Sequence, residues 1–73
     1  MIEVNGFKVK IWDDTSGDVW EDEVDAFTNA QAIGYAIEIA GWVGRDVKEA
    51  EVDGESWMRI RECWISCFVA SYI

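Results

Sequence analysis

The chain has 73 residues, with 15 Asp or Glu against 6 Lys or Arg, and its formal net charge is -9 at pH 7. A chain of this length is expected to form a single domain, residues 1–73, with little room for a deep pocket. Its negative charge excludes direct binding to nucleic acid or anionic membranes, and its 51% hydrophobic content excludes a disordered chain.

Residues 7–12 alternate apolar and polar side chains, which predicts a half-buried strand. Its apolar face carries Phe7, Val9 and Ile11. The dipeptide Asn5-Gly6 before it is typical of a turn. Residues 13–18, Asp-Asp-Thr-Ser-Gly-Asp, are turn formers and predict a loop.

Residues 19–26 predict the returning strand, at an edge of the sheet. Its apolar side carries Trp20, Val24 and Ala26, and carboxylates alternate on its other side. Asp22 falls on the apolar side, where an inward-pointing charge prevents an edge strand from pairing further.

A helix is predicted to begin after Thr28, because Gln31 three residues later completes a capping box. It runs toward Gly41 or Gly44, either of which can serve as the C-terminal glycine. Apolar residues leave only a narrow polar stripe, so the helix is expected to lie deep against a sheet. The predicted apolar rows include Ile33, Ile39 and Val43, and Gly34 and the alanines would allow a close approach of backbones.

Residues 47–52 predict a short strand in which Val47 is out of phase with Ala50 and Val52. Asp53-Gly54 is a two-residue hairpin signal, and residues 57–61 form the return. Residues 62–73 fit a strand or a helix, and their β-branched and aromatic content favours a strand with a break near Ser66. This strand is expected to pair also with the first strand.

These elements predict an α+β fold of two layers in the order ββαββ. A mostly antiparallel sheet would carry one helix packed on one face.

The sequence offers little chemistry for catalysis. It has no histidine for acid–base work and no phosphate-binding loop, which predicts that it is not an enzyme and uses no cofactor. The acidic loop from Asp13 lacks the Gly and Glu positions of a calcium-binding EF-hand. Cys63 and Cys67 without histidine are a poor zinc site, so no metal is expected and both thiols are predicted to be reduced and partly buried.

Seven carboxylates and no cation lie between Asp13 and Asp25. Alternate carboxylates on a strand lie about 6.6 Å apart, from ~3.3 Å per residue, and could imitate a short track of phosphates. Tryptophan beside acidic residues is typical of interface hot spots. The alternatives are a solvated edge strand and tryptophans used for core or dimer packing. The candidate partner-binding residues are Trp12, Asp13, Asp14, Asp18, Glu21, Glu23, Asp25 and Trp42.

In size, charge and order of elements the chain resembles small phage-encoded inhibitors, including anti-CRISPR and DNA-mimic proteins. The elements concerned are a hairpin, an alanine-rich helix capped by Thr28 and Gln31, and the closing Asp53-Gly54 hairpin. The resemblance covers the whole chain but carries over no functional residue.

The resemblance implies a non-catalytic protein whose acidic surface blocks a basic nucleic-acid-binding protein or nuclease, such as a CRISPR effector. The expected location is the cytoplasm of the host cell, because the sequence shows neither a membrane span nor an export signal. The alternative is a small structural or adaptor module that forms a homodimer through its Trp-rich sheet face or its C-terminal strand.

Overall fold

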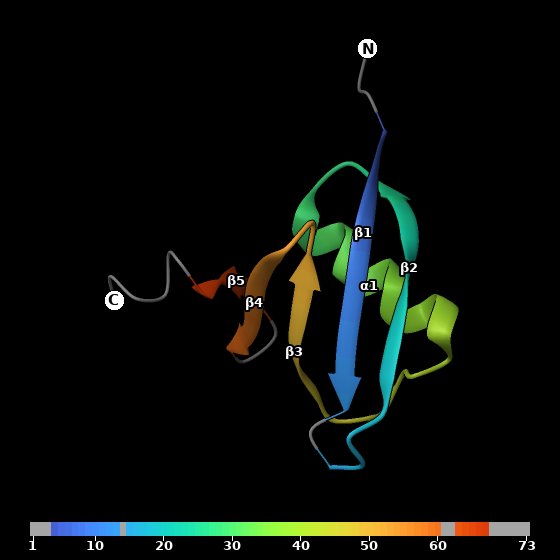
Figure 1. Ribbon diagram of the computed structural model, residues 1–73, viewed down its shortest axis with the longest axis vertical. Helices are drawn as coiled ribbons and strands as arrows, with labels where there is room; N and C mark the ends of the chain where they lie inside the picture. Colours follow the sequence, from blue (N-terminus) through green and yellow to red (C-terminus); the bar gives the residue numbers. More distant parts are fainter. Residues whose placement is uncertain (1–3, 14, 61–62, 68–73) are drawn as a thin grey trace.

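The computed structural model describes residues 4–13, 15–60 and 63–67, which form one sheet and one helix. The helix covers one face of the sheet (Figure 1), so the predicted two-layer α+β fold is confirmed. The order is ββαβββ, one strand more than predicted. The elements are β1 (Asn5–Asp13), β2 (Val19–Ala26), α1 (Asn29–Ala40), β3 (Val47–Val52), β4 (Glu55–Ile60) and β5 (Cys63–Ser66).

The five strands lie in the order β2-β1-β3-β4-β5, and every neighbouring pair is antiparallel. The predicted edge position of β2 is therefore confirmed. The predicted pairing of the last strand with the first is wrong, because β1 has β2 on one side and β3 on the other. Instead β5 pairs with β4, from Cys63 opposite Ile60 to Ser66 opposite Trp57. Of the predicted C-terminal segment 62–73, residues 62 and 68–73 lie outside the described residues, and Cys67 follows the end of β5.

Asn5 and Gly6 belong to β1 and do not form the predicted turn. They lie opposite Ala26 and Asp25, so the β1–β2 ladder runs to the end of β2. Gly6 has a packing role there, because a Cβ atom on it would lie 2.9 Å from Glu23 Oε1. Its missing side chain leaves room for that carboxylate over the sheet.

A β-bulge explains the phase of Val47. Trp12 lies opposite Glu49, but Asp13 lies opposite Val47, which leaves Lys48 as the extra residue. A bulge shifts the alternation of side chains by one position. Val47 therefore points into the core, where it is 1% exposed.

The core lies between α1 and the face of the sheet that it covers. It is built from small and β-branched side chains, and the buried alanines of α1 let the helix lie close to the strands. The buried apolar residues are Val9, Ile11, Val24, Ala26, Ala32, Ile33, Ala36, Val47, Ala50 and Val52.

The predicted Thr28 cap at the start of α1 is confirmed, and Gln31 bonds back to the residue before the cap. Thr28 Oγ1 accepts a hydrogen bond from the Gln31 amide (3.1 Å), and Gln31 Oε1 accepts one from the Phe27 amide (2.8 Å). The helix ends at Gly41, whose φ of 73° is left-handed, and the Trp42 amide donates to the Ile37 carbonyl (2.9 Å). Among the described residues, no helix has the length and apolar character that crossing a membrane requires.

The buried stripe of α1 is narrower than predicted. It contains Ala32, Ile33 and Ala36, whereas Ile39 is 64% exposed and Val43, beyond the helix end, is 73% exposed. A helix that touches one sheet on one side covers only that side, and among the described elements nothing packs on the other. Gly34 also faces open space, since a Cβ atom there would meet no atom within 4 Å.

This difference between helix faces gives a direct test with small substitutions. Ala36→Leu is expected to destabilise the fold by about 1–3 kcal/mol, because Ala36 is fully buried against the sheet and extra methyl groups overpack it. Gly34→Ala is the matched control and should stabilise the fold by about 0.5–1 kcal/mol, since glycine is costly inside a helix. Urea denaturation measures both. A destabilising Gly34→Ala would contradict the orientation of α1.

The open edge of β2 is protected by a side chain. The Lys8 amide donates to Asp53 Oδ1 (2.9 Å) and the Lys8 carbonyl accepts from the Asp53 amide (2.9 Å), so both backbone groups of Lys8 point toward β3. Glu23 lies opposite Lys8 in β2, and the two residues exchange no backbone hydrogen bonds because those of Lys8 point to β3. The backbone N–H and C=O of Glu23 therefore point away from β1, to the open edge. Asp22 Oδ1 accepts that edge amide of Glu23 at 2.8 Å.

Asp22→Val is expected to cause self-association, because it removes both the charge and the cap on the Glu23 amide and leaves a strand edge able to pair. Light scattering at micromolar concentration should show a mass above that of the monomer. Glu38→Val on the exposed side of α1 makes the same change in charge and apolarity away from the edge. Equal association of the two variants would assign the effect to hydrophobicity alone.

Candidate interaction surface

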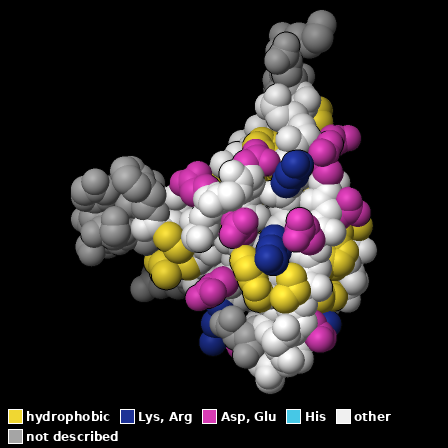
Figure 2. Space-filling view, viewed as in Figure 1, with side chains coloured by type: hydrophobic (Ala, Val, Ile, Leu, Met, Phe, Trp, Pro, Cys, Tyr) yellow, Lys and Arg dark blue, Asp and Glu magenta, His cyan; other side chains and the backbone are white. Residues whose placement is uncertain are grey.

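The face of the sheet opposite α1, which we call the outer face, carries the predicted acidic strand. Residues on alternate positions of β1 and β2 point into the core, so their neighbours point to the outer face. Glu21, Glu23 and Asp25 are all exposed there. Figure 2 looks onto this face and shows acidic side chains spread around a few basic ones, with hydrophobic surface beside them.

The outer face has a lysine strand between two acidic strands. In β1, Lys10 lies opposite Glu21 of β2 on one side and Glu51 of β3 on the other. Lys8 likewise lies opposite Glu23. The lysines reduce the repulsion between the two acidic rows, because opposite charges alternate across the strands.

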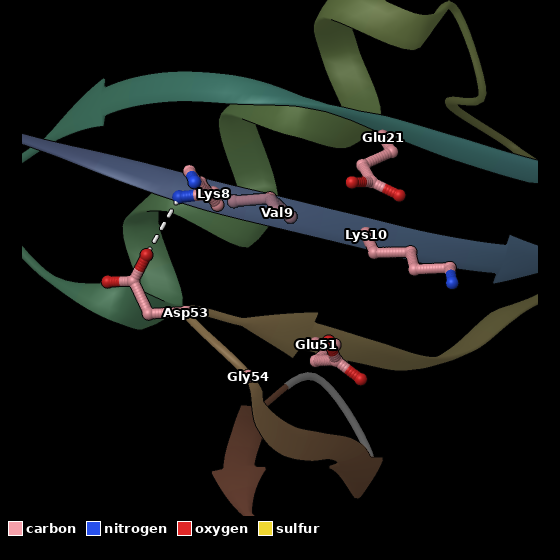
Figure 3. Close-up of a pocket in the computed structure, with 7 residues that line it drawn as sticks. All are labelled: Lys8, Val9, Lys10, Glu21, Glu51, Asp53 and Gly54. Atoms are coloured by element: carbon pink, nitrogen blue, oxygen red, sulfur yellow. Dashed lines mark hydrogen bonds between the residues drawn. The ribbon is translucent and has the colours of Figure 1, made fainter.

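A groove of about 460 Å³ follows these charges (Figure 3). Lys8 and Lys10 run along its floor on β1, while Glu21 and Glu51 flank it from the neighbouring strands. A hollow of about 300 Å³ adjoins it on the β2 side. In the described part of the chain, neither lysine side chain lies within 4.0 Å of a carboxylate oxygen, so Glu21 and Glu51 are open to solvent or to a partner. The Asp53 carboxylate is already engaged by the Lys8 amide. The groove residues are Lys8, Val9, Lys10, Glu21, Glu51, Asp53 and Gly54.

Two of the predicted site residues are bound internally by Arg45. Its Nε donates to Asp13 Oδ2 at 2.6 Å, and its Nη2 donates to Asp18 Oδ2 at 2.7 Å and to Ser16 Oγ at 2.9 Å. The Asp13 side chain is only 7% exposed. We call this group of four residues the Arg45 clamp. It joins the β1–β2 loop to the segment between α1 and β3.

The hydrogen bonds around the clamp hold the pKa values of both aspartates below their ordinary value of 3.8. For Asp13 the main cause is the hydrogen bond from the Thr15 amide (2.9 Å), followed by the bond from Arg45. For Asp18 the main cause is the bond from Arg45, followed by that from Ser16. Both carboxylates are therefore stabilised as anions by hydrogen bonds from the protein itself, which leaves them less available to a partner.

The two predicted tryptophans occupy different places. Trp42 is half-buried, packs against the core and lies under the Arg45 guanidinium, whose Cζ is 4.4 Å from the ring centroid. Trp12 is half-buried on the outer face, where Lys10 Nζ lies 5.4 Å from its ring centroid. Only Trp12 therefore joins the open acidic face. Of the other tryptophans, Trp20, Trp57 and Trp64 pack against the core.

Sequence reasoning missed the second acidic row and the lysines between the rows. Glu49 and Glu51 alternate in the same way as the β2 carboxylates, and this pattern was the available signal. The lysine row could be placed only once β1 was known to lie between β2 and β3. Asp14, the remaining predicted site residue, lies outside the described residues.

The two cysteines are free, as predicted, but only Cys67 is partly buried, whereas Cys63 is exposed. In the described ranges, no three Cys, Asp or Glu side chains are arranged to hold a metal ion. Comparison with protein-family models, with curated proteins and with solved structures finds no match to this chain. Function must therefore be argued from the outer face itself.

Proposed function

We propose that the protein is a non-catalytic binding protein whose outer face docks against a basic surface of a nucleic-acid-handling protein and occludes it. The observation that carries this proposal is the excess of carboxylates over lysines on one open face. Two lysines, Lys8 and Lys10, lie among the carboxylates of Glu21, Glu23, Asp25, Glu49, Glu51 and Asp53.

The geometry of the rows supports an imitation of nucleic acid. Carboxylates within a row lie about 6.6 Å apart, and rows two strands apart are separated by about 9.6 Å, from ~4.8 Å between strands. A DNA strand carries one charge per ~3.4 Å, so each row has about half its linear charge density, and the duplex also carries its charge in two rows. A groove lined with Lys and Arg would attract such a face.

The biological setting that we propose is inhibition of a bacterial defence nuclease, such as a CRISPR effector, by a phage-encoded protein. The small size, the net charge of -9 and the acidic sheet face support this setting. Inhibition by occlusion needs no catalytic group, only an acidic surface that competes with nucleic acid for the same basic groove.

Neutralising two carboxylates tests the proposal. Glu21→Gln with Glu51→Gln is expected to weaken binding about 2- to 30-fold, since each exposed ion pair contributes roughly 0.2–1 kcal/mol. The partner is first captured from bacterial lysate at low salt, and its affinity for each variant is then measured by calorimetry. Capture should fall as salt is raised, because exposed charges are screened.

The matched control removes the same charge from elsewhere. Glu38→Gln with Asp46→Asn changes the exposed side of α1 and the segment before β3, and should leave affinity unchanged. Equal weakening by the two double variants would mean that net charge, and not the outer face, drives binding. Undiminished binding by the Glu21 and Glu51 variant would refute the proposed function.

A further inference from the structure

One row of side chains that runs across the strands of the outer face is mainly apolar, unlike the acidic rows that run along β2 and β3. Cross-strand partners place its members side by side across all five strands: Val19 with Trp12, Trp12 with Glu49, Glu49 with Met58, and Met58 with Ile65. Val19 is 49% exposed, and Trp12, Met58 and Ile65 are half-buried. A single carboxylate, that of Glu49, therefore stands in the middle of an apolar row.

A hollow of about 210 Å³ opens beside Glu49. It is lined by Trp12, Glu49, Ala50, Ser56, Trp57 and Cys67. Trp12, Glu49 and Ser56 lie on the outer face, whereas Ala50 and Trp57 belong to the core side of their strands. An aromatic ring, an anion and a hydroxyl acceptor in one hollow form a site for a cation with an apolar stem. The contact between Lys10 and Trp12 shows that this ring already accepts a cation from its own chain.

We propose that this hollow, the Trp12–Glu49 hollow, receives an arginine side chain of the protein partner and is the anchor of the interface. This inference rests on the proposed function, because it names the group of the basic partner that the outer face recognises. Arginine fits better than lysine, since its planar guanidinium can hydrogen-bond to the Glu49 carboxylate and stack on Trp12. Tryptophan and arginine are also the residues most enriched at the energetic centres of interfaces.

A second copy of this chain fits the row poorly. A face-to-face dimer would bury Glu49 among apolar side chains without a cation to compensate it, which is costly. Each copy would also bring a net charge of -9 to the contact. A partner with an arginine between apolar residues satisfies both the carboxylate and its apolar neighbours.

The probe that tests the hollow is N-acetyl-arginine amide, with N-acetyl-citrulline amide as a neutral molecule of almost the same shape. Two-dimensional NMR should show saturable shifts at the Trp12 indole and at the amides of Glu49 and Ser56 with the arginine probe, and none with citrulline. Glu49→Gln should weaken binding of the arginine probe about 1.4- to 5-fold. Glu23→Gln, which removes a carboxylate from the same face at a distance from the hollow, should leave its affinity unchanged.

Shifts spread evenly over all acidic residues, or equal weakening by Glu49→Gln and Glu23→Gln, would overturn the hollow as a site. So would undiminished capture of the lysate partner by the Glu49→Gln protein. These failures differ from a failure of the proposed function, which is tested by Glu21 and Glu51. Binding that depends on Glu21 and Glu51 but not on Glu49 would keep the acidic face and remove the anchor.

Discussion

Arg45→Met is expected to lower the thermal midpoint clearly at pH 7 and to change it progressively less as pH falls below 3.8. The substitution leaves the Asp13 carboxylate without its guanidinium partner in a position where the side chain is 7% exposed. An anion with little access to water and without a cation is strongly unfavourable. The same change also removes the cation that lies over the Trp42 ring and the link to Asp18.

The pH dependence follows from the direction of the two pKa shifts. Asp13 and Asp18 have folded pKa values below the ordinary 3.8, so the folded protein holds fewer protons than the unfolded chain as the solution is acidified. Their contribution to stability is fully present above about 3.8 and is lost as pH falls through the lower folded values. Wild type and Arg45→Met should therefore differ most above pH 4 and converge in stronger acid.

Asp46→Asn is the control for this prediction. Asp46 pairs with Lys48 at 3.3 Å, but their side chains are 54% and 59% exposed, and exposed pairs contribute little. The thermal midpoints of all three proteins are measured by circular dichroism from pH 2 to pH 7, a range that covers the titration of carboxylates. A constant difference between wild type and Arg45→Met over that range would contradict the clamp.

The clamp also matters for the outer face, because it fixes the end of β1. Asp13 follows Trp12 directly, and Trp12 is the aromatic wall of the Trp12–Glu49 hollow. Protonation of Asp13 in acid would break its ion pair with Arg45 and destabilise the same end of β1. Partner binding is thus expected to weaken in acid through the loss of this strand end.

The sequence predicted those features that depend on neighbouring residues. The Thr28 cap, the Gly41 end of the helix and the Asp53-Gly54 turn are each decided within a few positions by backbone hydrogen bonds or by positive φ angles. The bounds of β2 and β3 also agree with the alternation of side chains. Local chemistry was sufficient for all of these.

Features set by contacts distant in the chain were missed. Arg45 lies 32 residues from Asp13 and 27 from Asp18, and nothing in its own surroundings indicates either partner. The pairing of β5 with β4, and the bulge at Lys48 that turns Val47 inward, depend on the order and register of strands. The candidate site was predicted in part for the same reason: one acidic row was visible, but its relation to the lysines and to Glu49 required the sheet.

Ile33→Ala is expected to cost about 2–5 kcal/mol, the usual cost of emptying a buried aliphatic site. Ile33 is 0% exposed and is among the largest fully buried side chains of the protein. A domain of this size is expected to have a total free energy of unfolding of about 4–11 kcal/mol, from ~0.05–0.15 kcal/mol per residue. The variant should therefore lose a large share of its free energy of unfolding, which urea denaturation measures. A partly unfolded population in water without urea would agree with such a loss.

Ile39→Ala removes the same atoms from the same helix and is expected to change stability by less than about 0.5 kcal/mol, because Ile39 is 64% exposed. The hydrophobic periodicity of the sequence predicted that both isoleucines face the sheet, since each lies on an apolar row of α1. Only the position of the sheet distinguishes them. Equal losses would mean that a second surface covers Ile39 in solution, whereas a large difference would confirm that α1 packs on the sheet through the face that carries Ala32, Ile33 and Ala36.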